Sequence, residues 1–402
     1  MLNYQYIDFD AHYYEPDDCF TRHIESKYKQ HTVRPDRSAE DGLGRMMIGD
    51  QRLRFTSVIQ NDFVGAPGLL KAFFKGESEG SGAVNLNPIC PREHEYMMQK
   101  PARLQVMDEH NIEACVMLPT LGVTVQHHLR EFPELEYPTL RAFNRWVQED
   151  WGFGEDGRIF GAACLTLNQL SEANEELERL IKAGVKALHL PCGPVQCIDG
   201  QIRSPGDPYF DSFWARAAEA NVLISFHIGE TNANELFSSQ WGEPANPPIH
   251  RFSALNTFWG IGGRTITDQI AAMICHDLFG RHPKLQIAII EFGSNWIFET
   301  LGNLDKIYRM ADHKTKWTFG KPSFKPSDIF KQHCSVVPFF EENISALSHY
   351  IGADNIINGS DFPHPEGLES PAEMLQELDE LCEIDVKKIM RGNAAKLLGL
   401  AA

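Results

Sequence analysis

The sequence lacks the features that mark several large classes of protein. No apolar run among its 402 residues is long enough to span a bilayer. The first residues, Met1 to Tyr4, have neither the basic region nor the long apolar stretch of a signal peptide. The nine cysteines are scattered and form no Cys-x-x-Cys pair, which is typical of reduced thiols in the cytosol. We therefore expect a cytoplasmic protein without a membrane partner.

Basic residues are also fewer than acidic residues. The chain has 37 Lys and Arg residues against 55 Asp and Glu residues, giving a formal net charge of −18. Nucleic acids and anionic membranes attract basic surfaces, so this balance argues against both as partners. Hydrophobic residues make up 43% of the chain and aromatic residues 10%, which suffices for a large core and argues against global disorder.

No Gly-x-Gly-x-x-Gly motif follows an early strand, which removes the main dinucleotide-binding alternative.

What the sequence does contain is an alternation of apolar strands with helices. The predicted strands are 7–12, 114–119, 159–165, 185–190, 222–227, 285–291, 334–338 and 356–361. Predicted helices cover 103–109, 137–151, 171–182 (capped by Ser171), 209–220, 268–279, 295–311 and 371–398. Eight such units predict a closed (β/α)₈ TIM barrel rather than an open doubly wound sheet.

Two long insertions interrupt this alternation. Residues 13–100, after the first strand, show no clean periodicity, and Lys75 to Gly82 within them are expected to be flexible. Residues 231–263, after the fifth strand, are rich in Gly, Pro and Trp. Long irregular insertions are often lids, and four phenylalanines favour a packed cover: Phe55, Phe63, Phe73 and Phe74. We therefore predict one domain over 1–402, with both insertions covering the active site.

Polar side chains stand at the carboxyl ends of the predicted strands. The first strand carries Asp10 and His12, which are two residues apart and so point to one face. The later strands end in His189 (fourth), His227 (fifth), Glu291 (sixth) and Asp361 (eighth). Because the carboxyl ends of barrel strands converge on one face, we expect these side chains to meet. Carboxylates and imidazoles together are ligands of divalent metals.

Four sequence patterns fall in the order found in a known family. They are RLQVMDEHNI (103–112), GRHPKL (280–285), NGSDFPH (358–364) and GNAAKL (392–397). With them the chain resembles the amidohydrolase-related group of the amidohydrolase superfamily over nearly its whole length after the first insertion. That group includes metal-dependent nonoxidative decarboxylases of aromatic and muconate-type acids, such as aminocarboxymuconate-semialdehyde decarboxylase and carboxyvanillate decarboxylase.

The resemblance implies a ligand set. The family's first-strand pair corresponds to Asp10 and His12, its fifth-strand His to His227, and its eighth-strand Asp, which binds metal and handles protons, to Asp361. The chain departs at Glu291, where family decarboxylases carry a proton-transferring His; a Glu there can ligate metal, act as a base or donate a proton. No Lys ends the fourth strand to bridge two metals. We expect one divalent ion, Zn first with Mn or Fe as alternatives, and leave open a second metal at Glu291.

Four further residues are candidates for substrate binding. His189 lies at the barrel mouth, where the alternative is a hydrogen-bonded core histidine. His364 follows Asp361 in a Pro-rich loop, where the alternative is a loop hydrogen bond. Arg251 can pair with a substrate carboxylate, and Trp259 belongs to the same lid-like insertion, although Arg is common on any surface.

These residues predict an enzyme acting on a small molecule, with Asp361 and Glu291 as catalytic residues. The leading expectation is a metal-dependent hydrolase in which activated water attacks an amide, ester, thioester or activated C–C bond of a carboxylated or aromatic substrate. The alternative is nonoxidative decarboxylation of an aromatic or muconate-type acid. A non-catalytic metal-binding barrel is a further alternative, because Asp10, His12, His227 and Asp361 are themselves four ligands. A homo-oligomer, such as a dimer, is left open.

Overall fold

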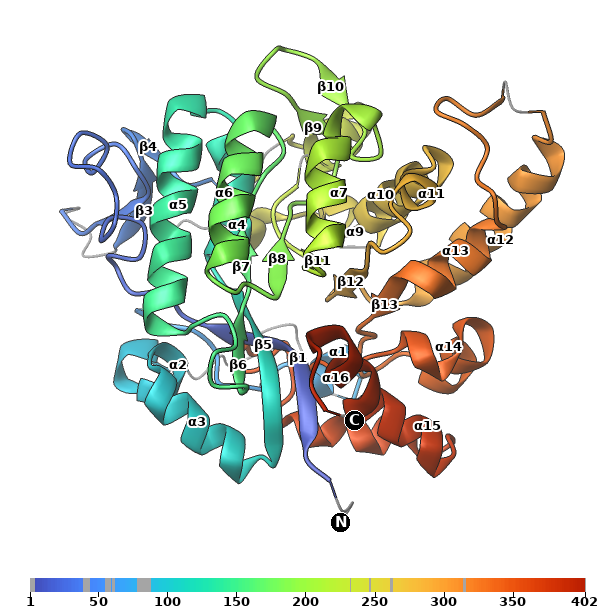
Figure 1. The fold of residues 1–402 in the computed structure, drawn as a ribbon. Coiled ribbons are helices and arrows are strands. Elements are labelled where there is room, and N and C mark those ends of the chain that lie inside the picture. Colours follow the sequence, from blue (N-terminus) through green and yellow to red (C-terminus); the bar gives the residue numbers. More distant parts are fainter. Residues whose placement is uncertain are drawn as a thin grey trace.

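A parallel β-barrel lies at the centre of the chain, with helices packed around it (Figure 1). The computed structural model describes residues 4–38, 44–54, 59, 62–77, 88–231, 233–245, 247–260, 263–313 and 316–401. The barrel strands are β1 (Tyr6–Tyr13), β5 (Ile112–Pro119), β6 (Ile159–Gly161), β7 (Ala163–Cys164), β8 (Ala187–His189), β11 (Leu223–His227), β12 (Ile287–Ile290) and β13 (Cys334–Val336). Two sheets, β1-β5-β6 and β13-β12-β11-β8-β7, contain them, and every neighbouring pair is parallel.

Backbone hydrogen bonds join the two sheets into a closed barrel on both sides. On one side only Ala162 separates β6 from β7, so the predicted third strand passes from one sheet to the other. On the other side the segment 356–362 lies between β13 and β1. There Ile357 N–H donates to Val336, Phe9 N–H to Asn358 and His12 N–H to Phe362. The predicted TIM barrel is therefore confirmed.

The predicted eighth strand differs from the expectation. The segment 356–362 makes only isolated bridges, Val336 with Ile356 and Ala11 with Phe362, instead of a continuous strand. The backbone of Asp361 takes the left-handed conformation with φ 56°, which ends the extended chain at that residue.

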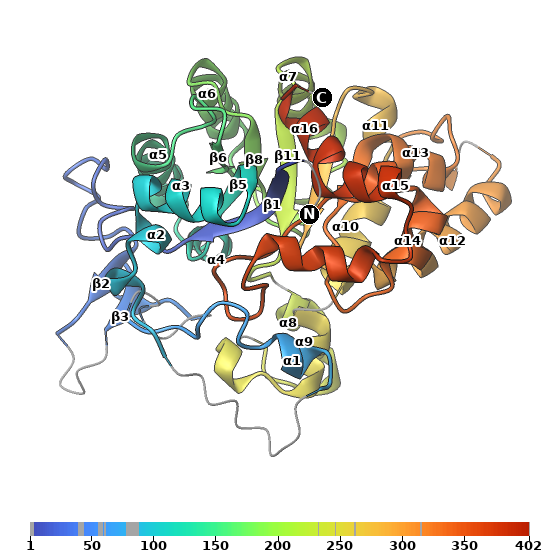
Figure 2. The same cartoon turned by 90° about the horizontal axis from the view of Figure 1, so that it is seen from below.

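Helices cover the outside of the barrel, as Figures 1 and 2 show. They are α3 (Lys100–Glu109), α4 (Gly122–Leu129), α5 (Pro133–Asp150), α6 (Leu170–Lys182), α7 (Asp211–Glu219), α10 (Arg264–Cys275), α11 (Leu278–Arg281), α12 (Asn295–Met310), α13 (Pro326–His333), α14 (Ile344–Ile351), α15 (Glu383–Lys387) and α16 (Asn393–Leu398). Alternate residues of β5 enter different parts of the core. Cys115 and Met117 pack with the outer helices, while Val116 and Leu118 share a cluster with Leu398 of α16.

Three helix predictions need correction. Helix α6 begins at Leu170 after Gln169, so Ser171 is not its cap. The helix predicted over 268–279 is two helices, α10 and α11, because Asp277 between them takes a left-handed conformation with φ 51°. The C-terminal segment 371–398 is a 3₁₀ helix (Pro371–Leu378), then α15, a π turn (Lys388–Gly392) and α16.

Both insertions contain regular structure. The first holds a small antiparallel sheet of β2 (Arg34–Asp36), β3 (Arg45–Ile48) and β4 (Gln51–Arg52), followed by α1 (Lys71–Phe74) and α2 (Glu95–Met98). The second holds α8 (Ala233–Leu236), two 3₁₀ turns (Ser238–Trp241 and Ile249–Arg251) and α9 (Ala254–Gly260). Figure 2 shows α1, α8 and α9 on the same side of the barrel. Their predicted role as covers stays a prediction.

The phenylalanines of the first insertion are less buried than a packed cover requires. Phe63, Phe73 and Phe74 are 46%, 48% and 44% exposed, and the last two pack mainly against each other, with ring centroids 5.7 Å apart. Phe55 and residues 78–82 of the segment expected to be flexible lie outside the described residues. The insertion is nevertheless tied to the barrel, because Leu70 N–H donates to the carbonyl of Pro365, 2.8 Å away.

Candidate metal centre

The five residues predicted as metal ligands lie together at the carboxyl ends of the barrel strands. Nε2 of His12 lies 3.1 Å from Asp10 Oδ1 and 3.4 Å from Asp361 Oδ1. Nε2 of His227 lies 3.4 Å from the same Asp10 oxygen and 2.9 Å from Glu291 Oε2. His364 joins them, with Nδ1 2.6 Å from Asp361 Oδ1. We call Asp10, His12, His227, Glu291, Asp361 and His364 the carboxylate–imidazole cluster.

The two imidazoles at its centre meet in a way that favours positive charge between them, from a proton or a metal ion. Nδ1 of His12 lies 3.2 Å from the carbonyl of Pro119, and Nδ1 of His227 lies 2.6 Å from the carbonyl of Ile228. A carbonyl only accepts, so in each neutral ring Nδ1 carries the proton and Nε2 has a free lone pair. The two Nε2 atoms are 3.1 Å apart, and two lone pairs at that distance repel. A metal ion relieves this, and Nδ1–H donation to a carbonyl is the usual support of a metal-binding His.

The backbone bends to bring the carboxylates into the cluster. Glu291 and Asp361, at the ends of the sixth and eighth strand positions, both have left-handed backbones, with φ 60° and 56°. This conformation destabilises residues other than glycine, and such backbone strain is concentrated at functional sites. Strand β1 also shifts register against β5 between Asp8 and Ala11, an irregularity of the kind often found beside active sites.

Asp8 holds the first and eighth strand positions in register. Its carboxylate accepts hydrogen bonds from Ser360 N, from Ser360 Oγ and from Asp10 N, at 3.0, 2.6 and 3.2 Å. Asp361 N–H in turn donates to the carbonyl of Asp10 at 2.7 Å. Asp8 therefore positions Asp10 and Asp361 relative to each other.

The cluster is rich in buried negative charge. Burial and the neighbouring carboxylates, Glu291 foremost, raise the pKa of Asp361 well above its usual value. Burial alone lowers the pKa of His227, but the charge of Glu291 and the contact with Asp10 outweigh it and raise this pKa to about 10. Three carboxylates around two imidazoles thus attract positive charge, either protons or a divalent cation. The donor set of carboxylate oxygens and imidazole nitrogens fits such a cation.

His364 was predicted to contact substrate, and the structure places it within the cluster itself. Its ring stacks on that of His12, with centroids 4.1 Å apart. Its Nε2 lies 2.8 Å from Thr120 Oγ1, and that hydroxyl donates to the carbonyl of Tyr13. His12, Asp361 and His364 together offer three atoms close enough to share one ion. His364 is therefore a candidate ligand or proton carrier, and its substrate contact stays a prediction.

His189 lies beside the cluster in a fixed tautomer. Its ring centroid is 6.4 Å from that of His227. Gln126 donates through Nε2 to the carbonyls of Leu165 and His189, so its Oε1 accepts from His189 Nδ1. Nε2 of His189 is consequently an unprotonated acceptor, buried and without a hydrogen-bond partner among the described residues. Burial lowers the pKa of His189 to about 3, in keeping with a neutral ring.

Arg251 and Trp259 are not brought to the cluster by any contact among the described residues. Arg251 ends a 3₁₀ turn and is exposed. Trp259 on α9 packs against Phe237 and Phe258, with centroids 5.5 and 5.1 Å away, and lies under the guanidinium of Arg264. Their predicted contact with substrate stays a prediction.

Three acidic or amide residues that support the site or its surroundings were not predicted from the sequence. Gln126 orients the ring of His189. The charge of the cluster also affects Glu366, because burial and then the charge of Glu291 raise the pKa of Glu366 to about 7. The carboxylate of Glu15 accepts from the backbone N–H groups of Leu121 and Gly122 at the start of α4. Glu366 follows His364 by two residues, and this proximity could have indicated a place near the site. Gln126 and Glu15 lie on segments without a strand pattern, so the sequence does not indicate their roles.

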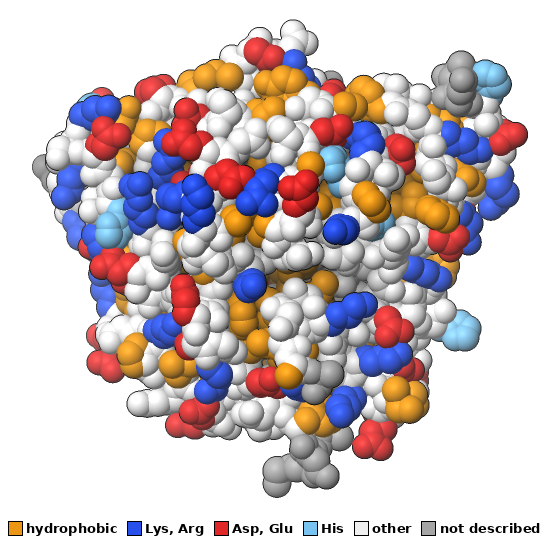
Figure 3. Space-filling model, viewed as in Figure 1, with side chains coloured by type: hydrophobic (Ala, Val, Ile, Leu, Met, Phe, Trp, Pro, Cys, Tyr) orange, Lys and Arg blue, Asp and Glu red, His pale blue; other side chains and the backbone are white. Residues whose placement is uncertain are grey.

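None of the described helices is long and apolar enough to cross a bilayer. On the face shown in Figure 3, basic and acidic side chains are interspersed, with apolar side chains between them.

The family model, the similar proteins and the similar structures agree with one another. The family model described as Amidohydrolase matches residues 93–400. Gamma-resorcylate decarboxylase of Rhodococcus jostii (strain RHA1) is 25% identical over 311 residues, which cover 74% of this chain and 87% of that protein. The crystal structure of an amidohydrolase from Mycobacterium avium subsp. paratuberculosis K-10 has a TM-score of 0.90 at 34% identity, covering 99% of this chain and 100% of that one.

A second solved structure shares the fold at lower identity. It is a dihydroxybenzoic acid decarboxylase from Polaromonas sp. JS666, with bound manganese and the inhibitor 2-nitroresorcinol. Its TM-score is 0.63 at 16% identity, and the match covers 98% of this chain and 97% of that one. At this identity the likeness concerns the fold.

Proposed function

Because this chain belongs to the amidohydrolase family, we propose that it is a metal-dependent enzyme that removes carbon dioxide, without oxidation, from a small aromatic carboxylic acid. The observation that carries the proposal is the convergence of His12 and His227, with Nε2 atoms 3.1 Å apart, on the carboxylates of Asp10 and Asp361. The decarboxylases among the relatives support decarboxylation over hydrolysis, which reverses the order expected from the sequence. Family membership makes the chain an enzyme, so the non-catalytic barrel is set aside.

We propose that Asp10, His12, His227 and Asp361 hold one divalent ion, with Glu291 or His364 completing its coordination. When bound, such an ion supplies Lewis-acid polarisation of a substrate oxygen. The manganese in the dihydroxybenzoic acid decarboxylase raises Mn²⁺ to the level of Zn²⁺ as the expected metal. Metal analysis of the purified protein decides between them.

The chain's own residues supply the proton that decarboxylation consumes. The bond between the ring carbon and the carboxylate breaks, carbon dioxide leaves, and the ring carbon keeps the electron pair and takes a proton. Asp361 is the proposed donor at this carbon. His364, 2.6 Å from its Oδ1, carries the replacement proton, and Thr120 fixes the far nitrogen of that ring.

Exchange of Asp361 for Asn tests the proposal. We expect Asp361→Asn to retain metal through Asp10, His12 and His227, and to lose at least about 100-fold in turnover, since proton transfer by one side chain commonly contributes 100- to 10,000-fold. Turnover is measured as carbon dioxide release from a panel of hydroxylated benzoic acids. The matched control, Asp312→Asn, changes a carboxylate whose side chain is 93% exposed and should leave turnover unchanged.

The origin of the product's atoms separates decarboxylation from hydrolysis. In ¹⁸O-labelled water a decarboxylase places no solvent oxygen on the released aromatic product. Label in that product, or full turnover by Asp361→Asn with its metal bound, would refute the proposal.

Hydrolysis is the second candidate, and one observation favours it. Glu291 Oε2 lies 2.9 Å from His227 Nε2, at the strand end where the decarboxylases that the chain resembles carry a His. A carboxylate there suits a general base for water. Under this alternative, Glu291→Gln abolishes ester or amide turnover, and solvent ¹⁸O enters the product.

A further inference from the structure

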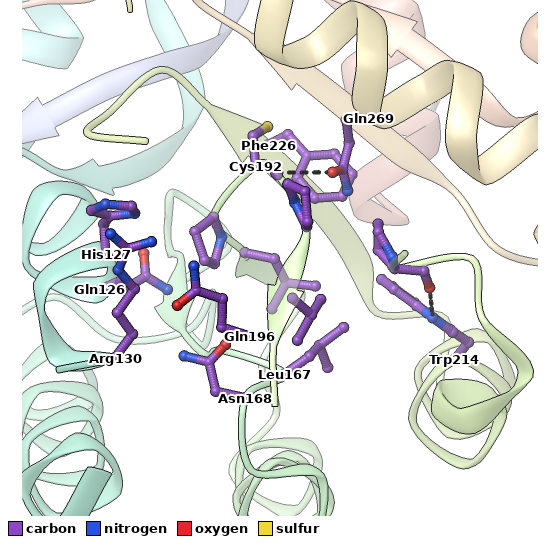
Figure 4. Close-up of a pocket in the computed structure, with 16 residues that line it drawn as sticks. Gln126, His127, Arg130, Leu167, Asn168, Cys192, Gln196, Trp214, Phe226 and Gln269 are labelled. Atoms are coloured by element: carbon purple, nitrogen blue, oxygen red, sulfur yellow. Dashed lines mark hydrogen bonds between the residues drawn. The ribbon is translucent and has the colours of Figure 1, made fainter. Parts of the chain in front are cut away.

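A hollow outside the barrel lumen lies under α4, at the carboxyl ends of the third to fifth strands (Figure 4). About 570 Å³ of space lies within it, counted to where it opens to solvent. Gln126, His127 and Arg130 of α4 form one wall. The loop from Leu190 to Gln196 forms another, and Trp214 of α7 and Gln269 of α10 close the back. We call it the α4 pocket.

The α4 pocket is separate from the carboxylate–imidazole cluster. No member of that cluster lines it. Phe226, which does, precedes His227 on β11, and neighbouring side chains of a strand point to opposite faces. His227 therefore faces the lumen and Phe226 faces outward into the pocket. Gln126 is the link between the two sites, because it lines the pocket and holds the ring of His189.

The polar wall of the pocket suits an anion. Among the described residues that line the pocket, Arg130 alone carries a formal charge, and none is a carboxylate. This is notable because the chain as a whole has a net charge of −18. Arg130 is paired with Glu235 at 2.9 Å, and its side chain is 12% exposed. That bond uses one guanidinium nitrogen, Nη2, and a guanidinium has five N–H donors.

His127 adds a second polar side chain to this wall. The residue is 8% exposed, and its ring nitrogens form no hydrogen bond with any described residue and are not closed off from solvent. Burial and the charge of Arg130 lower the pKa of His127 well below its usual value, so the ring is neutral and one nitrogen donates. A carboxylate oxygen would satisfy it.

The remaining walls combine three amide side chains, Asn168, Gln196 and Gln269, with apolar surface. Leu167, Leu190, Val195, Phe226 and Trp214 contribute aliphatic and aromatic surface opposite Arg130. The indole N–H of Trp214 is already used, since it donates to the carbonyl of Pro205 at 2.8 Å. The apolar part of these walls fits an apolar body.

We propose that the α4 pocket binds a small aromatic monocarboxylate, with its carboxylate on Arg130 and His127 and its ring against Phe226 and Leu190. This site is distinct from the site of turnover, and the inference does not depend on the reaction proposed above. Because Gln126 lines the pocket and also accepts a hydrogen bond from His189, an occupant lies beside the residue that fixes the ring of His189.

A ¹⁹F NMR titration of the metal-loaded enzyme with 4-fluorobenzoate tests this site. We expect saturable binding that Arg130→Gln weakens at least 10-fold and that Asp361→Asn leaves in place. The matched control is Arg145→Gln, which removes an exposed arginine of α5 and should change nothing. A second variant, Gln196→Trp, fills the pocket without changing charge or the Arg130–Glu235 pair, and should also abolish this binding.

The outcomes separate the α4 pocket from the proposed reaction. Binding whose affinity and stoichiometry are unchanged in both Arg130→Gln and Gln196→Trp, binding that disappears only in Asp361→Asn, or no saturable binding at all overturns the α4 pocket as a carboxylate site. Because the readout is binding, a failed turnover assay has no effect on it.

Discussion

Two residues of the cluster are held in a backbone conformation that favours glycine. Glu291 and Asp361 have φ 60° and 56°, and an L-residue pays roughly 1–2 kcal/mol for the left-handed region. The Glu291 side chain is 16% exposed, and its Oε2 lies 2.9 Å from His227 Nε2. The fold therefore gives up stability at this position to place a carboxylate in the cluster.

A pair of substitutions at Glu291 measures that cost. Glu291→Gly and Glu291→Ala remove the same carboxylate, but only glycine adopts φ 60° freely. We expect the glycine variant to be more stable than the alanine variant by about 1 kcal/mol, measured by urea denaturation. As a control, the same pair at Glu113, whose φ is not left-handed, should favour alanine. Equal stability of the two Glu291 variants would contradict the assigned strain.

At the scale of elements, helix α4 connects the barrel mouth to the first insertion. Its first turn is held by Glu15, whose buried carboxylate accepts from Leu121 N at 2.9 Å and from Gly122 N at 2.9 Å. An anion at a helix N-terminus is favoured by the helix dipole, but burial opposes its charge. Burial is the larger effect, and it raises the pKa of Glu15 from 4.5 to about 7.

This raised pKa makes stability depend on pH. Between pH 4.5 and about 7 the folded chain keeps a proton that the unfolded chain releases, so the free energy of unfolding falls as pH rises through this window. The full effect of the shift is about 3 kcal/mol. Glu15→Gln keeps an acceptor oxygen for both N–H groups and does not titrate. We expect the difference between wild type and variant to change across that window and to level off above pH 7.

Chemical denaturation at several pH values provides the measurement. The exposed Glu175, whose side chain is 75% exposed, gives the control variant Glu175→Gln, which should follow the wild-type curve. A wild-type curve parallel to that of Glu15→Gln would show that Glu15 has an ordinary pKa.

The strand elements and the convergence of the polar residues at their ends could be predicted because a parallel barrel imposes strict rules. Apolar runs must alternate with helices, and the polar residue that ends each run must face the mouth. Asp10, His12, His227 and Asp361 follow from those rules. The eighth strand position makes only isolated bridges, and the left-handed backbone at Asp361 leaves no trace in composition.

The insertions and supporting residues could not be predicted for a related reason. Their short strands and 3₁₀ turns are fixed by contacts with distant segments, such as the hydrogen bond of Leu70 N–H to Pro365. Gln126 and His127 sit on α4, where every residue is buried, so no amphipathic pattern distinguishes a polar contact from a packed side chain.

For the molecule as a whole, a chain of net charge −18 also gathers buried carboxylates at one end of its barrel. Without a cation, Asp10, Glu291 and Asp361 repel one another, and the Nε2 atoms of His12 and His227 face each other at 3.1 Å. A dication that binds only the folded state therefore adds stability by mass action.

Removal of metal should consequently destabilise the entire fold. At a free metal concentration about 100 times Kd, binding contributes about 3 kcal/mol, so we expect chelation to lower Tm measurably and added Mn²⁺ or Zn²⁺ to restore it. The double variant His12→Ala with His227→Ala removes both imidazole ligands and should show no response to chelator or metal. Scanning calorimetry of wild type and this variant, with metal content measured in the same samples, provides the comparison. A metal-loaded wild type whose Tm does not move on chelation, or a variant that responds as the wild type does, would place the ion elsewhere.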